Sequence, residues 1–215
     1  DLLVIDKPAG LPVHPSINHY ENTLANGIMW RCREKGEYFP FRCVNRLDAG
    51  TTGLLIIAKN MFSAAVLYSA MKERKIKRTY LAVASGEIRE PGTVDLPIGR
   101  VSDSVIERCI DQEHGERAVT HYEPLAYGNG CTLLKLQLET GRTHQIRVHM
   151  KAIGHPLAGD YLYAPEDCSA DRPLLHSRSL AFTHPVTQEP MKLTAELPED
   201  MKNYAEWKRR EEDEI

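Results

Sequence analysis

The chain has 215 residues, enough for one large domain or two small ones. Hydrophobic residues make up 42% and charged residues 27%, as in ordinary globular proteins, and no apolar run reaches the roughly 20 residues that span a membrane. The formal net charge is −3. The five cysteines are scattered and include no C-x-x-C pair, so neither a disulfide framework nor a zinc knuckle is indicated. This cysteine pattern favours reduced thiols in a cytoplasmic protein.

The first part of the chain is predicted to hold two strands and two helices. DLLVID (1–6) is predicted to be a strand, and the prolines and glycine of KPAGLPVHPS (7–16) favour an irregular loop. A helix is expected over 20–36, beginning near Asn22 or Thr23. GLLIIAK (53–59) is apolar on both faces, so it is predicted to be a buried strand. A second helix is expected from about Asn60, with its apolar stripe made by Phe62, Val66 and Ala70.

The second part is predicted to contain most of the strands. RTYLAVASG (78–86), AVTHYEPLAY (118–127), CTLLKLQLET (131–140) and LLHSRSLAFTHP (174–185) all have strand-like patterns. Residues 87–117 are polar and rich in turn formers and are expected to form an exposed excursion. A helix is expected over 143–153 with Thr143 as its N-cap. An acidic helical tail is expected over about 199–215. Many strands with few helices predict one α+β domain, 1–215, whose central sheet is mixed but largely antiparallel and is flanked by helices and loops.

One carboxylate, Asp48, stands in a turn before the buried strand at 53–59. A turn aspartate is usually structural, because its side chain can hydrogen-bond the backbone two residues on. The other interpretation is that the turn presents the carboxylate to a cleft. The stretch alone favours neither interpretation.

The predicted helix at 143–153 carries a second candidate residue. Ile146, Met150 and Ile153 form its apolar stripe, and Arg147 leaves the helix beside that stripe. An arginine at such a place pairs well with a carboxylate or phosphate, because its planar guanidinium can bind both oxygens at once. Asp48 is a candidate partner, and a surface arginine is the alternative.

Two stretches are locally basic, KERKIKR (72–78) and GRTHQIRVHMKAIGHP (141–156). A local basic patch matters more than the total charge for binding a polyanion, although a charge run is also typical of a solvated face. Other chemistries have less support. His144 and His149 are five residues apart and do not share a helix face as a zinc-binding pair would, so no metal is expected. The chain also contains no glycine-rich nucleotide loop and no G-x-S-x-G elbow, so no cofactor is expected.

Five segments, taken in order, resemble the motifs of a known family. RLDAGTTGLLIIAK (46–59) is similar to the catalytic motif of pseudouridine synthases, and KIKRTYLAVASG (75–86) to their tyrosine-bearing motif. LETGRTHQIRVHMKAIGHPLAGDYLY (138–163) resembles their arginine-bearing motif, and DKPAGLPVHP (6–15) and LLHSRSLAFTHP (174–185) fit as well. The resemblance covers nearly the whole chain. It is close to the RluA-type branch, which modifies ribosomal large-subunit RNA and transfer RNA.

The resemblance implies an isomerase with the pseudouridine synthase fold and an active-site cleft across the sheet. Such an enzyme breaks the bond between C1′ of ribose and N1 of uracil, turns the base, and joins C5 to C1′ without a cofactor. The family pattern implies that Asp48 acts near C1′, as nucleophile or as base. It also implies that Arg147 pairs with Asp48 and that Tyr80 stacks on the uracil. A uracil held in structured RNA must be flipped out to reach such a pocket.

The resemblance also implies which residues bind the substrate, and the sequence departs from the family pattern at two positions. Arg46 would enter the space that the flipped nucleotide leaves. The other residues implied to contact the substrate are Arg142, His144, Gln145 and either Leu174 or Leu175. Asn45 stands where the family usually has His, and Thr52 where Ser is usual.

The expected partner is therefore RNA, ribosomal or transfer, and a monomer is expected. Two other functions stay open. One is an RNA-binding protein on the same fold without turnover, against which the intact Asp48, Tyr80 and Arg147 argue. The other is a carboxylate-dependent hydrolase of nucleosides or glycosides, which would usually need a second carboxylate.

Overall fold

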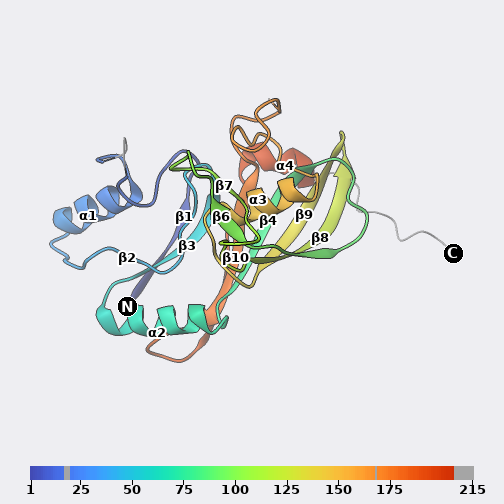
Figure 1. Ribbon diagram of the computed structural model, residues 1–215. Helices are drawn as coiled ribbons and strands as arrows, with labels where there is room; N and C mark the ends of the chain where they lie inside the picture. Colours follow the sequence, from blue (N-terminus) through green and yellow to red (C-terminus); the bar gives the residue numbers. More distant parts are fainter. Residues whose placement is uncertain (17–19, 168, 206–215) are drawn as a thin grey trace. The chain divides into compact units, whose positions relative to one another are not determined.

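The computed structural model describes residues 1–16, 20–167 and 169–205 (Figure 1). The chain forms two compact units, and each is described by itself. Unit 1 comprises Asp1–Arg78 and Ser177–Glu196, and unit 2 comprises Thr79–His176 and the segment from Leu197. The part of the predicted acidic tail beyond residue 205 lies outside the described residues.

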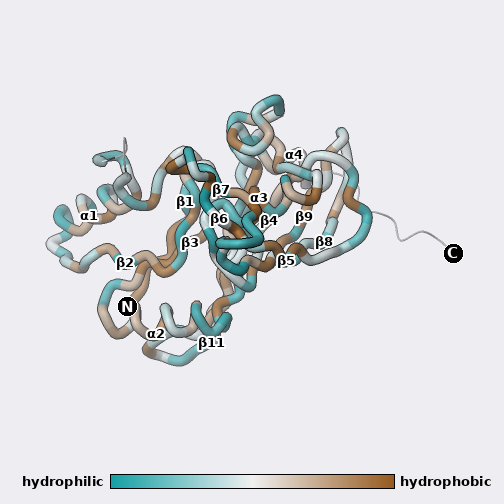
Figure 2. The backbone as a smooth tube through the Cα atoms, viewed as in Figure 1, coloured by the Kyte–Doolittle hydropathy of each residue, from teal (hydrophilic) through white to brown (hydrophobic). Residues whose placement is uncertain are grey.

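Unit 1 is built around the apolar strand that the sequence predicts at 53–59. This strand, β3 (Thr52–Ala58), pairs with β1 (Leu2–Lys7), β2 (Arg42–Cys43) and β10 (Leu175–Thr183), and β10 pairs in turn with β11 (Pro190–Thr194). The pairs of β3 with β1 and β2 are antiparallel, as is the pair of β10 with β11. Every residue of β3 is buried, and the strand is the brown, apolar run in Figure 2. Its side chains pack with Leu67, Leu180 and Phe182 in one core.

Two helices belong to unit 1, and both N-caps lie where the sequence predicts them. In α1 (Leu24–Glu34), Thr23 and Asn26 form a reciprocal capping box. In α2 (Met61–Lys72), the Asn60 side chain accepts a hydrogen bond from Ser63 N at 2.8 Å. These side chains satisfy backbone N–H groups that have no partner within the helix.

The predicted apolar stripe of α2 is wrong at Phe62, whereas Val66 is half-buried and Ala70 packs against the core. Phe62 is 62% exposed, and the helix buries Ser63, Ala64 and Leu67 instead. Most residues of α2 are apolar or small, so its pattern contrasts two faces only weakly. The core of unit 1 therefore selects a face about one residue away from the predicted one.

Unit 2 contains an antiparallel sheet in the order β4 (Lys77–Ser85), β9 (Cys131–Leu138), β8 (Val119–Gly128) and β5 (Gly92–Asp95). A separate ribbon pairs β6 (Ile98–Arg100) with β7 (Arg108–Ile110). The segment 87–117 is thus not wholly an exposed excursion, because β5 joins the sheet and Val94 and Ile98 are buried.

In the part of unit 2 that the structure describes, the helices are α3 (Gln145–Ala152) and α4 (Glu199–Ala205). The helix predicted at 143–153 exists, but its N-cap is His144 rather than Thr143. His144 has a left-handed backbone with φ of 57°, and its side chain does not cap the helix. Residues 145–150 of α3 are buried, among them Ile146 and Met150 of the predicted apolar stripe, whereas Lys151 and Ala152 at the end of the helix are exposed.

Candidate active site

The predicted catalytic aspartate lies in a tight turn of unit 1. Asp48 is the first of four turn residues, and its backbone oxygen accepts a hydrogen bond from Thr51 N at 3.0 Å. Aspartate is favoured at the first position of such turns. The side chain is partly buried, while Leu47 before it is buried and Ala49 after it is exposed. The turn therefore anchors one neighbour in the core and leaves the carboxylate near the surface.

A buried lysine fixes this turn. Lys7 is 1% exposed at the end of β1, and its ammonium group donates to Ala49 O at 2.9 Å and to Pro8 O at 2.7 Å. Burying an ammonium group is costly unless it is hydrogen-bonded, so the two carbonyls compensate the lysine while the lysine holds the turn. Sequence analysis missed this residue, because lysines are almost never fully buried.

Glycine is required where β3 begins after the turn. Gly53 has a backbone φ of 102°, a conformation that residues other than glycine rarely adopt. A Cβ at this position would lie 2.3 Å from the backbone oxygen of Ser177 on β10. The glycine thus allows β10 to approach the start of β3 closely. This contact fixes the start of the strand that follows the turn of Asp48.

Asn45, which replaces the usual histidine, forms hydrogen bonds with β3. Its amide oxygen accepts from Ile56 N at 2.9 Å, and its amide nitrogen donates to Leu54 O at 3.3 Å. The side chain is 5% exposed and acts as an additional backbone-like partner for the strand. Asn45 is therefore a support for the segment leading to Asp48, three residues before it.

Arg46 is exposed, as its proposed role requires. Its charge, together with the larger effect of partial desolvation, lowers the pKa of His14 below the ordinary value of 6.5. The His14 ring packs edge-on against Phe41, with ring centroids 5.1 Å apart. Since a lowered pKa leaves His14 neutral near pH 7, Arg46 supplies the positive charge at this place.

In unit 2, Arg147 has a partner that sequence analysis missed. The guanidinium binds Asp160 through two hydrogen bonds, Nε to Oδ2 at 2.8 Å and Nη2 to Oδ1 at 2.7 Å. The side chain of Arg147 is 3% exposed and that of Asp160 is 0% exposed. Asp160 also accepts from Leu162 N and Tyr163 N, each at 3.2 Å. This carboxylate therefore orients Arg147 rigidly.

Aromatic side chains complete the surroundings of Arg147. Its guanidinium carbon lies 5.0 Å from the ring centroid of Tyr163 and 5.7 Å from that of Tyr161. The Tyr163 hydroxyl is 2.8 Å from Nδ1 of His144 and accepts a hydrogen bond from Arg108 N at 3.0 Å. The ring contacts and the Asp160 pair hold the arginine by cation–π attraction and by charge. The predicted contact of Arg147 with Asp48 stays a prediction, because the two residues belong to different units.

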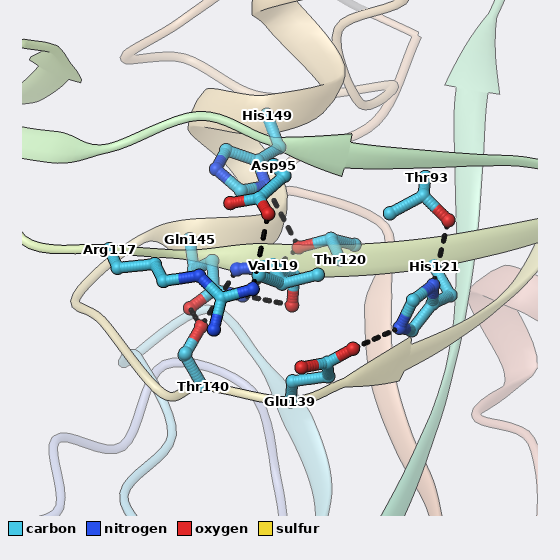
Figure 3. A network of polar contacts seen from close by, with 10 residues as sticks. All are labelled: Thr93, Asp95, Arg117, Val119, Thr120, His121, Glu139, Thr140, Gln145 and His149. Carbon is cyan, nitrogen blue, oxygen red and sulfur yellow. Dashed lines mark hydrogen bonds and ion pairs between the residues drawn. The ribbon is translucent and has the colours of Figure 1, made fainter. Parts of the chain in front are cut away.

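The start of α3 is held by a polar network (Figure 3). The Gln145 amide nitrogen donates to Val119 O and to the Thr120 hydroxyl, and its oxygen accepts from Thr140 Oγ1 and Arg142 N. The Arg142 side chain pairs with Glu116 and donates to Arg117 O. Gln145 thus joins the start of α3 to β8 and to the preceding loop, and the Arg142 side chain joins that loop to residues 116 and 117. Their predicted contacts with substrate stay predictions.

The same network includes His149 of α3 and side chains of the neighbouring strands. His149 Nδ1 lies 2.9 Å from the Thr120 hydroxyl, and its Nε2 lies 3.0 Å from Leu96 O. Thr93 of β5, His121 of β8 and Glu139, which directly follows β9, form a chain of contacts at 2.8 and 2.9 Å (Figure 3). Neighbouring strands are linked in this way by their side chains.

The remaining predicted residues lie on strands of unit 2. Tyr80 is 4% exposed on β4, opposite Leu136 of β9. Leu175 is 4% exposed at the start of β10. A cavity of about 490 Å³ on β5, β8 and β9 is lined by none of the predicted site residues. Within the described residues, no group of three His, Cys, Asp or Glu side chains could hold a metal ion. No helix of the described chain is both long and apolar enough to span a bilayer.

Comparison with known proteins shows the family to which these motifs belong. The family model of the RNA pseudouridylate synthases matches residues 1–152. The chain belongs to this family. It is 45% identical to the uncharacterized RNA pseudouridine synthase YjbO of Bacillus subtilis, over 93% of this chain and 71% of that protein. It is 41% identical to the ribosomal large subunit pseudouridine synthase D of Nitrosomonas europaea, over 93% of this chain and 60% of that protein.

A solved structure gives the same result for the fold. Human RNA pseudouridylate synthase domain containing 1 superposes with a TM-score of 0.76 at 29% identity, covering 98% of this chain and 85% of the human chain. The predicted α+β pseudouridine synthase fold, with its largely antiparallel sheet, is therefore confirmed. The predicted enzyme class is confirmed as well, because the family consists of isomerases that act on RNA.

Proposed function

We propose that this protein converts uridine to pseudouridine in large-subunit ribosomal RNA, with Asp48 as its catalytic carboxylate. The relatives that support this substrate include ribosomal large subunit pseudouridine synthases D of Nitrosomonas europaea and Vibrio vulnificus, at 41% and 39% identity. Transfer RNA is the alternative substrate. A cytoplasmic location and a monomeric state, predicted from the sequence, remain part of the proposal.

The fixed conformation of the turn at Asp48 is the observation that carries the proposal. A buried lysine, a buried asparagine and a glycine with positive φ all fix this one loop, at Lys7, Asn45 and Gly53. Each is a costly feature for a loop that only connects two strands. A fixed geometry is what a carboxylate needs when it must meet a ribose carbon at one defined place.

The proposed reaction needs one carboxylate and a site that keeps the detached base. Asp48 either attacks C1′ while the bond to N1 breaks, or acts as a base that takes the proton of C2′ while this bond breaks. The uracil then turns and C5 bonds to C1′, as the carboxylate leaves C1′ in the first route or the proton returns to C2′ in the second. The hydrogen of C5 is lost to solvent while N1 gains a proton. The product has the same atoms as the substrate, so the reaction consumes no cofactor.

The other residues of the motifs have supporting roles in the proposal. Tyr80 stacks on the uracil and assists removal of the C5 proton. Arg147, oriented by Asp160, provides the positive charge that keeps a neighbouring carboxylate ionised. Arg46 occupies the gap that the flipped nucleotide leaves, and its exposed position in the loop supports this role. Leu175 packs against the base.

Product analysis on defined RNA tests the proposal. Unmodified transcripts of large-subunit ribosomal RNA and of transfer RNA would be incubated with the protein, digested to nucleosides and separated by chromatography. We expect pseudouridine from the ribosomal transcript and none without protein. Pseudouridine from transfer RNA alone would move the substrate to transfer RNA while leaving the enzyme class unchanged.

The same experiment separates the two rival functions. A non-catalytic RNA-binding protein would retain the transcripts on a filter and yield no pseudouridine from either RNA. A hydrolase would release free uracil or leave abasic positions. Either pattern would contradict the proposed isomerisation.

A further inference from the structure

A surface of unit 1 outside the catalytic motifs carries an exposed tryptophan. The buried residues of α1 are Leu24, Ala25, Ile28 and Cys32. At 100° per residue, Trp30 lies at the middle of the opposite face, and it is 66% exposed. An indole has much to gain from burial, so an exposed one at the centre of a helix face contributes little to the fold.

The helix also leaves space beside this indole. A helical side chain leans toward the N-terminus of its helix, so Trp30 lies toward the turn that contains Gly27. The backbone of Gly27 does not have positive φ, and a Cβ at this position would meet no atom within 4 Å. Neither backbone conformation nor packing requires a glycine here. The absence of a side chain at Gly27 instead leaves the indole of Trp30 accessible to a planar group that could stack on it.

A second exposed aromatic ring follows the helix. Glu37 N donates to Cys32 O at 2.9 Å, which folds the chain back against the end of α1. Phe39 is buried, with the Lys59 ammonium 5.1 Å from its ring centroid. Tyr38, immediately before this anchor, is 85% exposed. The fold thus fixes the segment through one aromatic ring and leaves the next one in solvent.

Basic side chains lie between the two exposed rings in the sequence. Arg31, Arg33 and Lys35 are exposed, and none of them makes an ion pair with another residue that the structure describes. Glu37, an acid beside them, is paired with Lys59 at 3.2 Å. The negative end of the helix macrodipole favours cations in the last turn of α1. It does not explain the exposed aromatic rings on either side of them.

We propose that Trp30, Arg31, Arg33, Lys35 and Tyr38, the α1 surface, bind unpaired nucleotides of the RNA substrate away from the catalytic turn. Rings on which bases stack and cations that pair with phosphates are the two elements of single-strand binding. The charge of unit 1 also fits, because 14 lysines and arginines against nine aspartates and glutamates give it a formal net charge of +5. The inference rests on the proposed function in taking RNA as the ligand.

Tryptophan fluorescence tests the stacking directly. The chain has two tryptophans, so Trp207→Phe leaves Trp30 as the only one. The probe is a short single-stranded RNA oligonucleotide of mixed sequence, compared with its duplex. We expect the single strand to quench the fluorescence and the duplex to quench it much less, since paired bases are not free to stack. Unchanged fluorescence at RNA concentrations that saturate binding would overturn the proposal.

Substitutions measure the contribution to affinity. Trp30→Ala should weaken binding of the single strand at least about fivefold, whereas Trp30→Phe should keep most of the affinity. Phe62→Ala is the matched control, because Phe62 is 62% exposed on α2 of the same unit. Equal affinities of the Trp30→Ala and Phe62→Ala proteins would overturn the proposal.

The charged part of the surface has its own test. The double variant Arg31→Gln, Arg33→Gln should weaken binding and reduce the dependence of affinity on salt. Lys192→Gln, an exposed position on β11, is the control for loss of a charge elsewhere in unit 1. A salt dependence equal to that of the control would overturn the role of these arginines.

Turnover measurements separate this proposal from the proposed function. Trp30→Ala should raise KM for ribosomal RNA and leave kcat unchanged. Normal turnover with unchanged KM and no quenching would overturn the α1 surface alone. Quenching by RNA in a protein that makes no pseudouridine would overturn the proposed function alone.

Discussion

Unit 1 and unit 2 use their charged residues in different ways. Unit 1 has a formal net charge of +5, and the cations of its α1 surface are exposed and unpaired with other described residues. Unit 2 has 13 lysines and arginines against 21 aspartates and glutamates, a formal net charge of −8. Its arginines at 142, 147 and 172 pair with Glu116, Asp160 and Asp200. The total charge of −3 hides this difference.

The comparison indicates where RNA is attracted and where the fold is stabilised. Exposed cations raise the local concentration of a polyanion, whereas cations already paired with carboxylates contribute little to that attraction. The basic stretch at 141–156 therefore acts mostly within unit 2, as Arg142 and Arg147 show.

The largest effect on stability is expected for Arg147→Met. This change leaves the fully buried Asp160 carboxylate without its cation, and breaking such a pair typically costs about 3–5 kcal/mol. The free energy of unfolding in urea would measure the loss. The double variant Arg147→Met, Asp160→Leu removes both charges and should recover most of the stability. A stable single variant would contradict the structural role of charge pairs in unit 2.

A smaller effect is expected for Lys7→Met in unit 1. The change removes two hydrogen bonds from a buried ammonium group and leaves Ala49 O without this donor, at a cost of about 1–3 kcal/mol. Because the lysine fixes the turn of Asp48, kcat should fall more than KM changes. Lys59→Met, at a partly exposed position, is the control. Full activity of the Lys7→Met protein would show that the turn does not need this support.

A change of pH is expected to alter the free energy of unfolding through His149 in unit 2, by an amount similar to or smaller than the effect of Lys7→Met. Desolvation by burial lowers the pKa of His149 below 6.5, against smaller opposing effects of Leu96 O and the Asp95 charge. The unfolded state therefore takes up a proton first as pH falls below about 6.5, and stability decreases until the folded-state pKa is passed. The slope is at most about 1.4 kcal/mol per pH unit.

Urea unfolding at pH 7.5 and pH 5.5 checks this prediction. His149→Gln should show a smaller loss of stability between the two pH values than the wild type. His114→Gln, whose side chain is 82% exposed, is the control and should behave as the wild type. An equal loss in all three proteins would exclude His149 as the source.

The sequence was informative where one local pattern determines the structure. The uninterrupted apolar run of β3 and the capping residues Thr23 and Asn60 act within a few positions of the chain, so their elements were predicted correctly. The weak pattern of α2 gave a stripe that is wrong at Phe62, which was predicted to be buried and is exposed. The short strands β5, β6 and β7 carry three or four residues each, too few for periodicity to show.

The candidate site was predicted in part for the same reason. Asp48, Tyr80 and Arg147 were selected through motifs, and their roles stay predictions. Lys7 and Asp160 were missed, since their roles depend on partners 42 and 13 residues away. Burial of a charged group is a tertiary property, and the sequence pattern around each residue is that of an ordinary loop or strand end. Their partners became evident only from the folded chain.

Loss of tritium from RNA labelled at C5 of uridine, measured for the wild type and for Asp48→Asn, tests the central claim most directly. The substrate would be ribosomal RNA without the modification, with filter binding run in parallel. We predict tritium release by the wild type, none by Asp48→Asn, and RNA binding by both proteins. Release by the Asp48→Asn protein at the wild-type rate would contradict the assignment of Asp48 as the catalytic carboxylate.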